Sequence, residues 1–240
     1  MNIVIDFGNS FTKVGIFEQD KLVQTFVTGK NESSQVIQQI PLSNYQSAII
    51  SSVIDSPDGI MEPLQNICKK VIVFDKTTCT TLTNKYTSPE TLGNDRLALA
   101  SGAAMLYKNK NILIIDAGSC ITYDFVNEMG EYIGGAISPG IDMRFKALNT
   151  FTDKLPLLQK ENTSVFTGRN TKESMLSGVM NGVYSEINSS INYYKRNYKN
   201  LEIVLCGGDA IFLSKKIKSR IFAEPNFLLI SLNQILLHNE

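Results

Sequence analysis

The sequence is poor in the residues that most often build metal sites and acid–base machinery. Its 240 residues include one histidine, His238, and four cysteines. This scarcity excludes histidine-based acid–base catalysis and argues against a zinc site with histidine ligands. The cysteines Cys68, Cys79, Cys120 and Cys206 form no CxxC pair and no disulfide-type spacing. We therefore expect reduced thiols and a cytoplasmic protein.

Net charge and long apolar runs are absent as well. Lys plus Arg number 23 and Asp plus Glu number 23, so the formal net charge is zero. This balance argues against a basic surface for nucleic acid or for an anionic membrane. No apolar run reaches the roughly 18–20 residues that a membrane-spanning helix needs. The N-terminus lacks a basic region, so we expect no signal peptide. We expect neither nucleic acid nor a membrane as a partner.

The sequence does contain enough apolar material for a substantial core. Hydrophobic residues make up 43% of the chain and charged residues 19%, which is typical of a globular protein and not of a disordered one. The length of 240 residues fits one large domain or two small ones. An internal repeat favours two.

The repeat joins the N-terminal segment MNIVIDFGNSFTKVGIF to the central segment ILIIDAGSCITYDFV. Each has an apolar strand, then Asp-x-Gly and a hydroxyl-bearing turn, then a strand with two-residue alternation. One offset of 110 residues aligns Asp6 with Asp116 and Gly8 with Gly118. Turn chemistry produces single matches easily, but two copies at this separation indicate two similar half-molecules.

The predicted protein is therefore α/β with two similar domains, residues 1–110 and 111–240. In the first domain we expect further strands at 22–28, 48–53 and 71–74 and helices at 57–70 and 94–107. In the second, the segment YIGGAISPG (132–140) precedes a helix expected to about residue 150, and we expect a strand in 201–206 and further helices at 171–197 and the C-terminus. Helix 171–197 would use Gly178 and Gly182 as close-contact points. The C-terminal helix would pack on the core, with an amphipathic membrane anchor as the alternative.

Both repeated turns carry residues suited to binding a polyphosphate. Glycine lets backbone N–H groups approach an anion without a Cβ in the way, and a carboxylate at a strand end can hold Mg²⁺. The candidates are Asp6, Gly8, Asn9, Ser10 and Lys13 in the first turn and Asp116, Gly118 and Ser119 in the second. The alternative is that each aspartate only caps its turn, and Lys13 could face a phosphate or solvent.

A third glycine-rich turn follows the strand at 201–206. The residues Gly207-Gly208-Asp209 would let the backbone approach the base or ribose of a nucleotide. A helix N-cap at Asp209 explains the same residues equally well.

These three turns, in this order, resemble the actin-like ATPase and sugar kinase superfamily. That superfamily has two ribonuclease-H-like domains, with mixed sheets flanked by helices and a nucleotide cleft between the domains. Within it, the chain is most similar to the type III pantothenate kinases. The matching segments are IDFGNS, YTSPETLGNDR, IDAGSCITYD, GGAISPG, TDKLP, GRNTKESMLSGVMNG and LCGGDA. They span essentially residues 1–215, and the combination of GxDR with GGxIxPG is specific.

The resemblance implies ATP-dependent phosphorylation of pantothenate to 4'-phosphopantothenate, the first step of coenzyme A biosynthesis. It also implies Mg²⁺, a monovalent cation (K⁺ or NH₄⁺) and a homodimer with the acceptor pocket near the subunit contact. The alternative is a non-catalytic nucleotide-binding or transcription accessory protein of the same fold. Such a protein would not need GNDR, Tyr86 and Thr171, all of which are present. A sugar or acetate kinase is disfavoured because the chain leaves little room for the insertions of those families.

Carried over by position, the resemblance implies roles for individual residues. Asp95 would be the catalytic base, and Asp116 would bind the monovalent cation. The residues implied in ATP binding are Asp6, Phe7, Gly8, Asn9, Ser10, Phe11, Thr12, Lys13 and Ser119. Those implied in pantothenate binding are Tyr86, Gly93, Asn94, Asp95, Arg96 and Thr171.

The chain departs from the family pattern at a few positions. Ser10 and Ser119 stand where threonine is usual, and each keeps the hydroxyl. Asn94 stands where alanine is frequent, and Cys120 is interpreted as a small buried filler and not a nucleophile.

Several implied residues also have ordinary structural explanations. Asp95 and Arg96 could form a surface ion pair at a helix start, and Tyr86 and Thr171 could be ordinary loop and N-cap residues. If the kinase interpretation holds, Arg96 could bind the pantothenate carboxylate or steady Asp95.

Overall fold

The structure is a computed structural model that describes residues 1–30, 33–52 and 59–240. By packing, the chain divides into two compact units. The first unit comprises Met1–Asn109, Val126–Ile133 and Asn226–Glu240, and the second comprises Lys110–Phe125 and Gly134–Pro225. The domain limits 1–110 and 111–240 stay a prediction; packing adds the C-terminal helix to the first unit.

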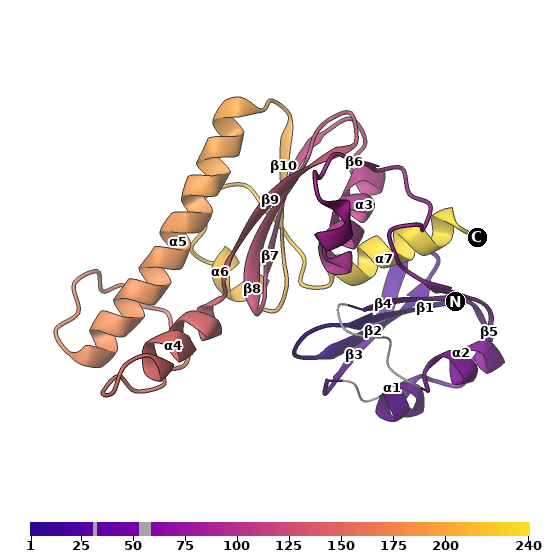
Figure 1. Cartoon of the computed structure of the whole chain (residues 1–240), viewed down its shortest axis with the longest axis horizontal. Coiled ribbons are helices and arrows are strands. Elements are labelled where there is room, and N and C mark those ends of the chain that lie inside the picture. The colour runs from indigo at the N-terminus through magenta and orange to yellow at the C-terminus, as the bar shows by residue number, and fades with distance from the viewer. Residues whose placement is uncertain (31–32, 53–58) are drawn as a thin grey trace. The chain divides into compact units, whose positions relative to one another are not determined.

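The first unit is built on a five-stranded sheet of order β3-β2-β1-β4-β5 (Figure 1). Its strands are β1 (Asn2–Phe7), β2 (Thr12–Glu18), β3 (Lys21–Thr28), β4 (Tyr45–Ser52) and β5 (Cys68–Val73). Strand β2 pairs antiparallel with β1 and β3, and β4 pairs parallel with β1 and β5. A short hairpin suffices for the antiparallel pairs, whereas the parallel pairs need longer crossover connections.

Helices cover both faces of this sheet (Figure 1). They are α1 (Ser33–Gln39), α2 (Met61–Ile67), α3 (Asn94–Leu106) and α7 (Phe227–His238). A 3₁₀ turn, η1 (Pro89–Thr91), precedes α3. The side chains of Ile3, Ile5 and Phe7 lie in the core formed with α1 and α2. Because side chains alternate along a strand, Asp6 points to the other face, on which α3 and α7 pack.

The second sheet has the order β11-β10-β7-β8-β9-β6. Its strands are β6 (Thr83–Asn84), β7 (Asn111–Ala117), β8 (Cys120–Val126), β9 (Glu131–Pro139), β10 (Leu201–Cys206) and β11 (Phe222–Ala223). Apart from β6, which pairs with the start of β9, the order β9-β8-β7-β10-β11 repeats that of the first sheet. The parallel pairs β7–β10 and β10–β11 repeat β1–β4 and β4–β5. The predicted repeat is confirmed, and Asp6 and Asp116 occupy equivalent strand positions.

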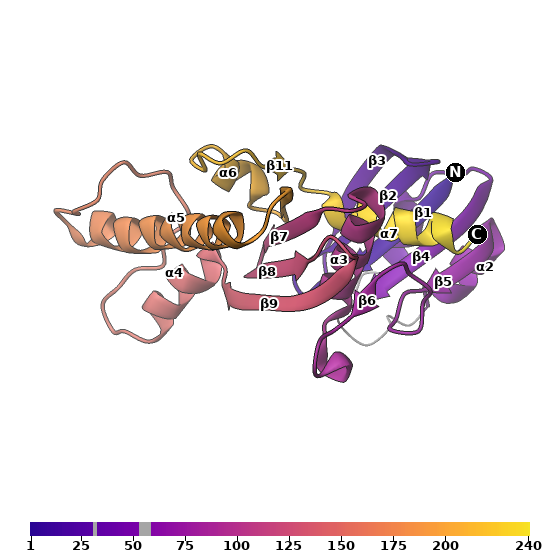
Figure 2. The same ribbon diagram turned by 90° about the horizontal axis from the view of Figure 1, so that it is seen from above.

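Three helices cover one face of the second sheet: α4 (Ile141–Thr150), α5 (Thr171–Asn197) and α6 (Ala210–Ser214). Figure 2 shows α4 and α6 on opposite sides of the long α5. The core between this layer and the sheet includes Leu113, Ile115 and Ala117 of β7. By alternation, Asp116 therefore points away from α5.

Most predicted elements are confirmed, and two expectations are wrong. The helix expected at 57–70 ends at Ile67, because Cys68 begins strand β5 and pairs with Tyr45 of β4. Gly178 and Gly182 are not close-contact points: a Cβ on Gly178 would meet no atom within 4 Å, and on Gly182 only an Arg144 nitrogen at 4.0 Å. Residues 53 and 57–58 of the predicted elements lie outside the described residues. The sequence did not predict α1, β6, β9 or β11.

Close helix contact occurs instead at Gly102 of α3. A Cβ there would lie 2.2 Å from the Ser231 Cβ of α7, and both residues are fully buried. We expect Gly102→Ala to destabilise the protein by about 1–3 kcal/mol, the usual cost of overpacking a core. Gly178→Ala is the matched control: this exposed helix position has open space, so alanine should stabilise by about 0.4–1 kcal/mol. Urea unfolding of both variants measures the difference, and equal effects would contradict the packing.

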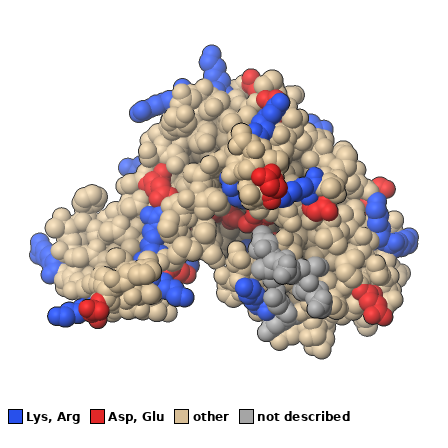
Figure 3. All heavy atoms as spheres, in the orientation of Figure 1, with Lys and Arg blue, Asp and Glu red and all other residues tan. Residues whose placement is uncertain are grey.

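None of the helices in the described part of the chain is long and apolar enough to cross a membrane. On the face shown in Figure 3, basic and acidic side chains are interspersed, as the balanced composition predicts.

Candidate functional site

The first repeated turn joins β1 and β2 in a tight hairpin. The Gly8 backbone N–H donates to the Phe11 carbonyl over 3.1 Å and closes the turn. Asp6 is only 5% exposed at the end of β1, whereas residues 9–10 at the tip are exposed. Lys13 lies opposite Asp6 in the antiparallel ladder, so a carboxylate and an ammonium group occupy the same face of the sheet.

Two predicted ATP-binding residues of this turn have no side-chain surface to offer. Phe7 and Thr12 are fully buried and pair with each other in the ladder. Only their backbone groups could reach a ligand. Phe11 is different, because 59% of it is exposed.

The N-terminus of α3 is attached to the carboxyl end of β4. The Asn94 side-chain amide donates to the Ser52 carbonyl over 3.2 Å, and Ser52 is the register partner of Phe7. Because β1 and β4 are parallel neighbours, their carboxyl ends lie side by side. This contact brings the start of α3 to the sheet edge at which Asp6 lies, and it gives Asn94 a structural role that the sequence did not reveal.

Asp95 follows at the second position of α3 and is partly exposed. Its Oδ1 accepts a hydrogen bond from the Arg96 backbone N–H over 2.8 Å. A Cβ on Gly93 would lie 2.5 Å from that same oxygen, so this carboxylate orientation requires glycine there. The positive end of the helix dipole also favours a carboxylate at this position.

Arg96 is a buried residue with 6% of its surface exposed, so the interpretation of Asp95 and Arg96 as a surface ion pair is wrong. Its guanidinium carbon lies 5.7 Å from the ring centroid of Tyr86, within the range of a cation–π interaction. The Tyr86 ring in turn lies 5.9 Å from that of Tyr132. In the first unit, Asn94 thus links the start of α3 to the end of β4 beside the first turn, and Arg96 links α3 to Tyr86.

The second repeated turn joins β7 and β8. The Gly118 backbone N–H donates to the Cys120 carbonyl over 2.8 Å, much as Gly8 closes the first turn. Asp116 is partly exposed and Ser119 is exposed at the tip. The side chain of Cys120 is half-buried.

The glycine-rich turn after β10 packs directly on the end of β7. The Asp209 backbone N–H donates to the Ala117 carbonyl over 2.9 Å. Gly207 has a φ of +87°, and a Cβ there would lie 2.3 Å from Asp116 Oδ1. Asp209 occupies the N-cap position of α6, but its side chain makes no capping hydrogen bond. Capping therefore does not explain this aspartate.

The segment before α4 supports the second turn from another side. The Gly140 backbone N–H donates to the Ser119 carbonyl over 3.1 Å. Arg144 holds this segment, because its Nε donates to the Pro139 carbonyl over 2.8 Å and its Nη2 lies 2.7 Å from Glu186 Oε2 on α5.

Glu186 is the centre of a polar network that sequence reasoning missed. It accepts hydrogen bonds from Tyr123 Oη at 2.8 Å and Ser138 Oγ at 3.1 Å, besides Arg144. Burial raises the pKa of Glu186, but these hydrogen bonds lower it more, so the net pKa is below its usual value. Burial and the bond to Glu186 raise the pKa of Tyr123. These residues are far apart in sequence and share no motif.

Thr171 lies elsewhere in the second unit, as the exposed first residue of α5. The cap of this helix is Asn170, whose side chain accepts a hydrogen bond from the Glu173 backbone N–H over 2.9 Å. The alternative interpretation of Thr171 as an ordinary N-cap is therefore wrong. Thr171 and Ser119 are in the second unit, whereas Tyr86 and Asp95 are in the first.

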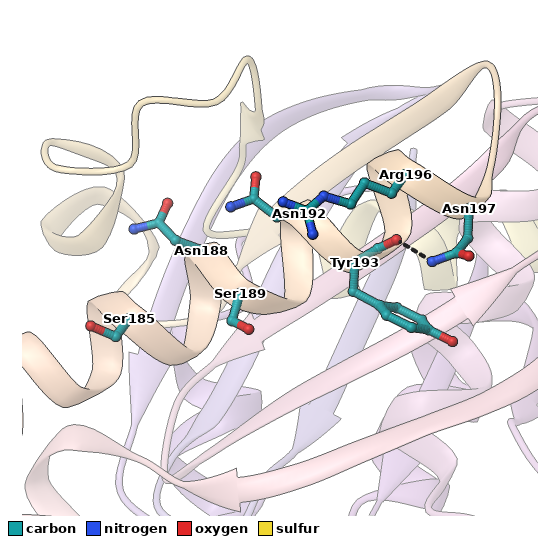
Figure 4. A pocket seen from close by; sticks show the side chains of 7 residues that line it. All are labelled: Ser185, Asn188, Ser189, Asn192, Tyr193, Arg196 and Asn197. Carbon is teal, nitrogen blue, oxygen red and sulfur yellow. Dashed lines mark hydrogen bonds between the residues drawn. The ribbon is translucent and has the colours of Figure 1, made fainter.

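A hollow on the surface of α5 does not coincide with any predicted site residue (Figure 4). It is lined by Ser185, Asn188, Ser189, Asn192, Tyr193, Arg196 and Asn197. All seven residues come from one helix, and the Asn197 side chain is bonded to the Tyr193 carbonyl at 2.7 Å. An open helix face with no acidic side chain is not the surroundings that phosphoryl transfer requires.

Comparison with known proteins identifies the chain's relatives. The sequence profile of type III pantothenate kinase matches residues 2–193. A type III pantothenate kinase from Christiangramia forsetii is 40% identical over 243 aligned positions, which cover 100% of this chain and 99% of the relative.

Solved structures share the fold at much lower identity. A protein of Campylobacter jejuni assigned to the Baf family of transcriptional activators has a TM-score of 0.64 and 22% identity, covering 99% of this chain and 98% of its own. An inorganic polyphosphate/ATP-glucomannokinase from Arthrobacter has a TM-score of 0.50 and 13% identity, covering 98% of each chain. The α/β fold with two mixed sheets is thus that of the actin-like ATPases and sugar kinases.

Proposed function

The chain belongs to the type III pantothenate kinase family, and on this premise we propose which of its residues carry out the reaction. The enzyme is a phosphotransferase that phosphorylates pantothenate with ATP in the first step of coenzyme A biosynthesis. The observation that carries the assignment of residues is the hydrogen bond by which Asn94, next to Asp95, attaches the start of α3 to the end of β4, whose neighbouring strand β1 carries Asp6.

Asp95 acts as the general base. A carboxylate is too weak a base to form an alkoxide from an alcohol in advance, so Asp95 orients the pantothenate hydroxyl and accepts its proton late in a loose transition state. The bond from the Arg96 N–H and the closeness of Gly93 to Asp95 Oδ1 support this role, because they restrict the orientation of the carboxylate. Positioning of this kind supplies much of the acceleration in phosphoryl transfer.

Each repeated turn carries groups that can bind phosphates of ATP. Backbone N–H groups near Gly8 and Gly118 and the hydroxyls of Ser10 and Ser119 are the donors, and Lys13 contributes positive charge. The exposure of the turn tips supports this role. For Phe7 and Thr12, whose side chains are buried, only backbone contacts are proposed.

Asp6 is the residue that fits Mg²⁺ bound to ATP. Ser51 is the register partner of Asp6, and within the described residues its fully buried hydroxyl has no hydrogen-bond partner. A carboxylate and an unused hydroxyl are oxygen donors of the type that Mg²⁺ or its water ligands accept. When bound there, Mg²⁺ would supply positive charge that offsets the charge of the phosphates.

Asp116 fits a monovalent cation, K⁺ or NH₄⁺. Asp116 Oδ1 and the Ala117 carbonyl oxygen both lie beside Gly207, at 2.3 and 2.4 Å from the position that a Cβ would take there. Among the described residues, no three His, Cys, Asp or Glu side chains are grouped for a metal ion. One carboxylate and neighbouring carbonyl oxygens suit a monovalent cation, because such an ion carries a single positive charge. Such a cation adds positive charge near the phosphates.

Pantothenate is bound by Tyr86, Gly93, Asn94, Arg96 and Thr171. Arg96 can donate two parallel hydrogen bonds to the pantothenate carboxylate, and its position against the Tyr86 ring limits its orientations. Asn94 acts through the backbone it anchors to Ser52. We also propose a homodimer in the cytoplasm, as the family resemblance implies.

The direct test is pantothenate-dependent ADP formation. The purified protein with MgATP and K⁺ should release ADP only when pantothenate is added, with one 4'-phosphopantothenate formed per ADP. Replacing K⁺ with Na⁺ should reduce the rate if Asp116 binds the cation. ATP binding without pantothenate-dependent turnover would contradict the kinase and favour a nucleotide-binding protein that performs no chemistry.

A further inference from the structure

Lys160, in the segment 151–170 between α4 and α5, contacts the third glycine-rich turn. Its ammonium group forms an ion pair with Asp209 Oδ1 and lies 3.9 Å from Asp142 Oδ2 at the start of α4. The Asp209 side chain is 8% exposed, against 75% for that of Asp142. Water screens an exposed carboxylate strongly, so Asp209 is the partner that matters.

Asp209 places a second negative charge at the end of β7. Its backbone N–H is bonded to the Ala117 carbonyl, and Gly207 of the same turn lies against Asp116. A buried carboxylate with no counter-charge here would repel the phosphates of a nucleotide, because water screens a buried charge poorly.

The Lys160 ammonium stays protonated and cancels this charge. Burial lowers its pKa, but the hydrogen bond and charge of Asp209, with a further contribution from Asp142, raise it more, so the net pKa is above its usual value. At neutral pH Lys160 therefore carries its positive charge beside Asp209.

We propose that Lys160 is a positioning residue for nucleotide binding: by neutralising Asp209, it makes the turn 207–209 compatible with an anionic nucleotide. This inference rests on the proposed function, because it takes the ends of β7 and β10 to be part of the ATP site. Lys160 acts through Asp209 and does not itself contact the reacting atoms.

Other contacts hold the segment 151–170 without Lys160. The Ser177 hydroxyl donates to the Phe166 carbonyl over 2.6 Å, and the Asn181 amide donates to the Val165 carbonyl over 3.1 Å. The Lys216 ammonium donates to the Thr163 carbonyl. Loss of Lys160 should thus expose the charge of Asp209 without releasing the segment.

The experiment compares four variants by calorimetric titration with a non-hydrolysable MgATP analogue. We expect Lys160→Met to weaken binding about tenfold, the effect of one poorly screened charge, and Lys160→Arg to bind within about threefold of the parent chain. Lys216→Met is the matched control, because it removes another lysine contact to the same segment but leaves Asp209 paired. This control should bind the MgATP analogue with the affinity of the parent chain. The double variant Lys160→Met/Asp209→Asn should regain most of the affinity, because the uncompensated charge is gone.

The results separate this inference from the proposed function, since titration needs no turnover. If Lys160→Met binds the nucleotide analogue with the affinity of the parent chain, the inference about Lys160 is overturned. Equal weakening of nucleotide binding by Lys160→Met and Lys216→Met would also overturn the inference, because that result would indicate only a loosened segment. A double variant that binds as weakly as Lys160→Met would overturn it as well. If the four variants bind the nucleotide analogue as expected but the parent chain forms no pantothenate-dependent ADP, only the kinase activity is contradicted.

Discussion

Replacing Asp95 with asparagine should lower kcat by roughly 10²–10⁴, the range typical of a lost general base, while ATP binding persists. The substitution is nearly isosteric, and the amide oxygen can still accept the hydrogen bond that the Arg96 N–H gives Asp95 Oδ1. The geometry at the start of α3 should therefore survive, and the loss should fall on the proton-accepting step. Steady-state kinetics with saturating pantothenate, together with ATP titration, measures the two effects separately.

Glu62→Gln is the matched control for this variant. Glu62 is also an acidic residue in the first turn of a helix of the first unit, but it is exposed on α2 and belongs to no predicted site. Its loss should leave kcat within about twofold, as for ordinary surface substitutions. Near-normal turnover by Asp95→Asn would remove Asp95 from the role of base.

A second large effect is expected from Gly207→Ala. The φ of +87° already disfavours a side chain by roughly 1–2 kcal/mol, and the new Cβ would collide with Asp116 Oδ1 and the Ala117 carbonyl. We expect lower stability together with an ATP affinity reduced at least tenfold, because the end of β7 must shift. Thermal unfolding and nucleotide titration measure the two losses.

The neighbouring Gly208→Ala provides the comparison for stability. A Cβ on Gly208 would meet no atom within 4 Å, and its φ is outside the left-handed range. Its stability should change by no more than about 0.5 kcal/mol. If both variants unfold at the same temperature, close packing of the turn against Asp116 is refuted.

Local pattern predicted most of the fold because the determining interactions are close in sequence. The repeated strand–turn–strand units carry their alternation within a few residues of Asp6 and Asp116, and both hairpins form. The helix wrongly predicted through Cys68 shows where local sequence pattern fails. The neighbours of Cys68 favour a helix, but parallel pairing with Tyr45 on β4 prevails, and no local window contains that partner.

The residues of the candidate site also divide into those that the local sequence predicts and those that it does not. The residues of the turns and of GNDR stand in compact motifs, so sequence and family resemblance reach them together. Lys160 and Glu186 do not: each is an ordinary charged residue, and each acquires its importance from partners such as Asp209 and Tyr123 that folding brings close. The same is true of Asn94, whose carbonyl partner lies on β4.

Helix α7 has a consequence for how the protein is made. It follows the second unit in the sequence, yet it packs on the first sheet: the Leu229 side chain lies beside Gly15, and the Asn233 amide donates to the Gln19 carbonyl over 2.8 Å. While the ribosome is still elongating the chain, the N-terminal half therefore lacks one layer of its core. Its final folding must wait until residues 227–238 have left the ribosome.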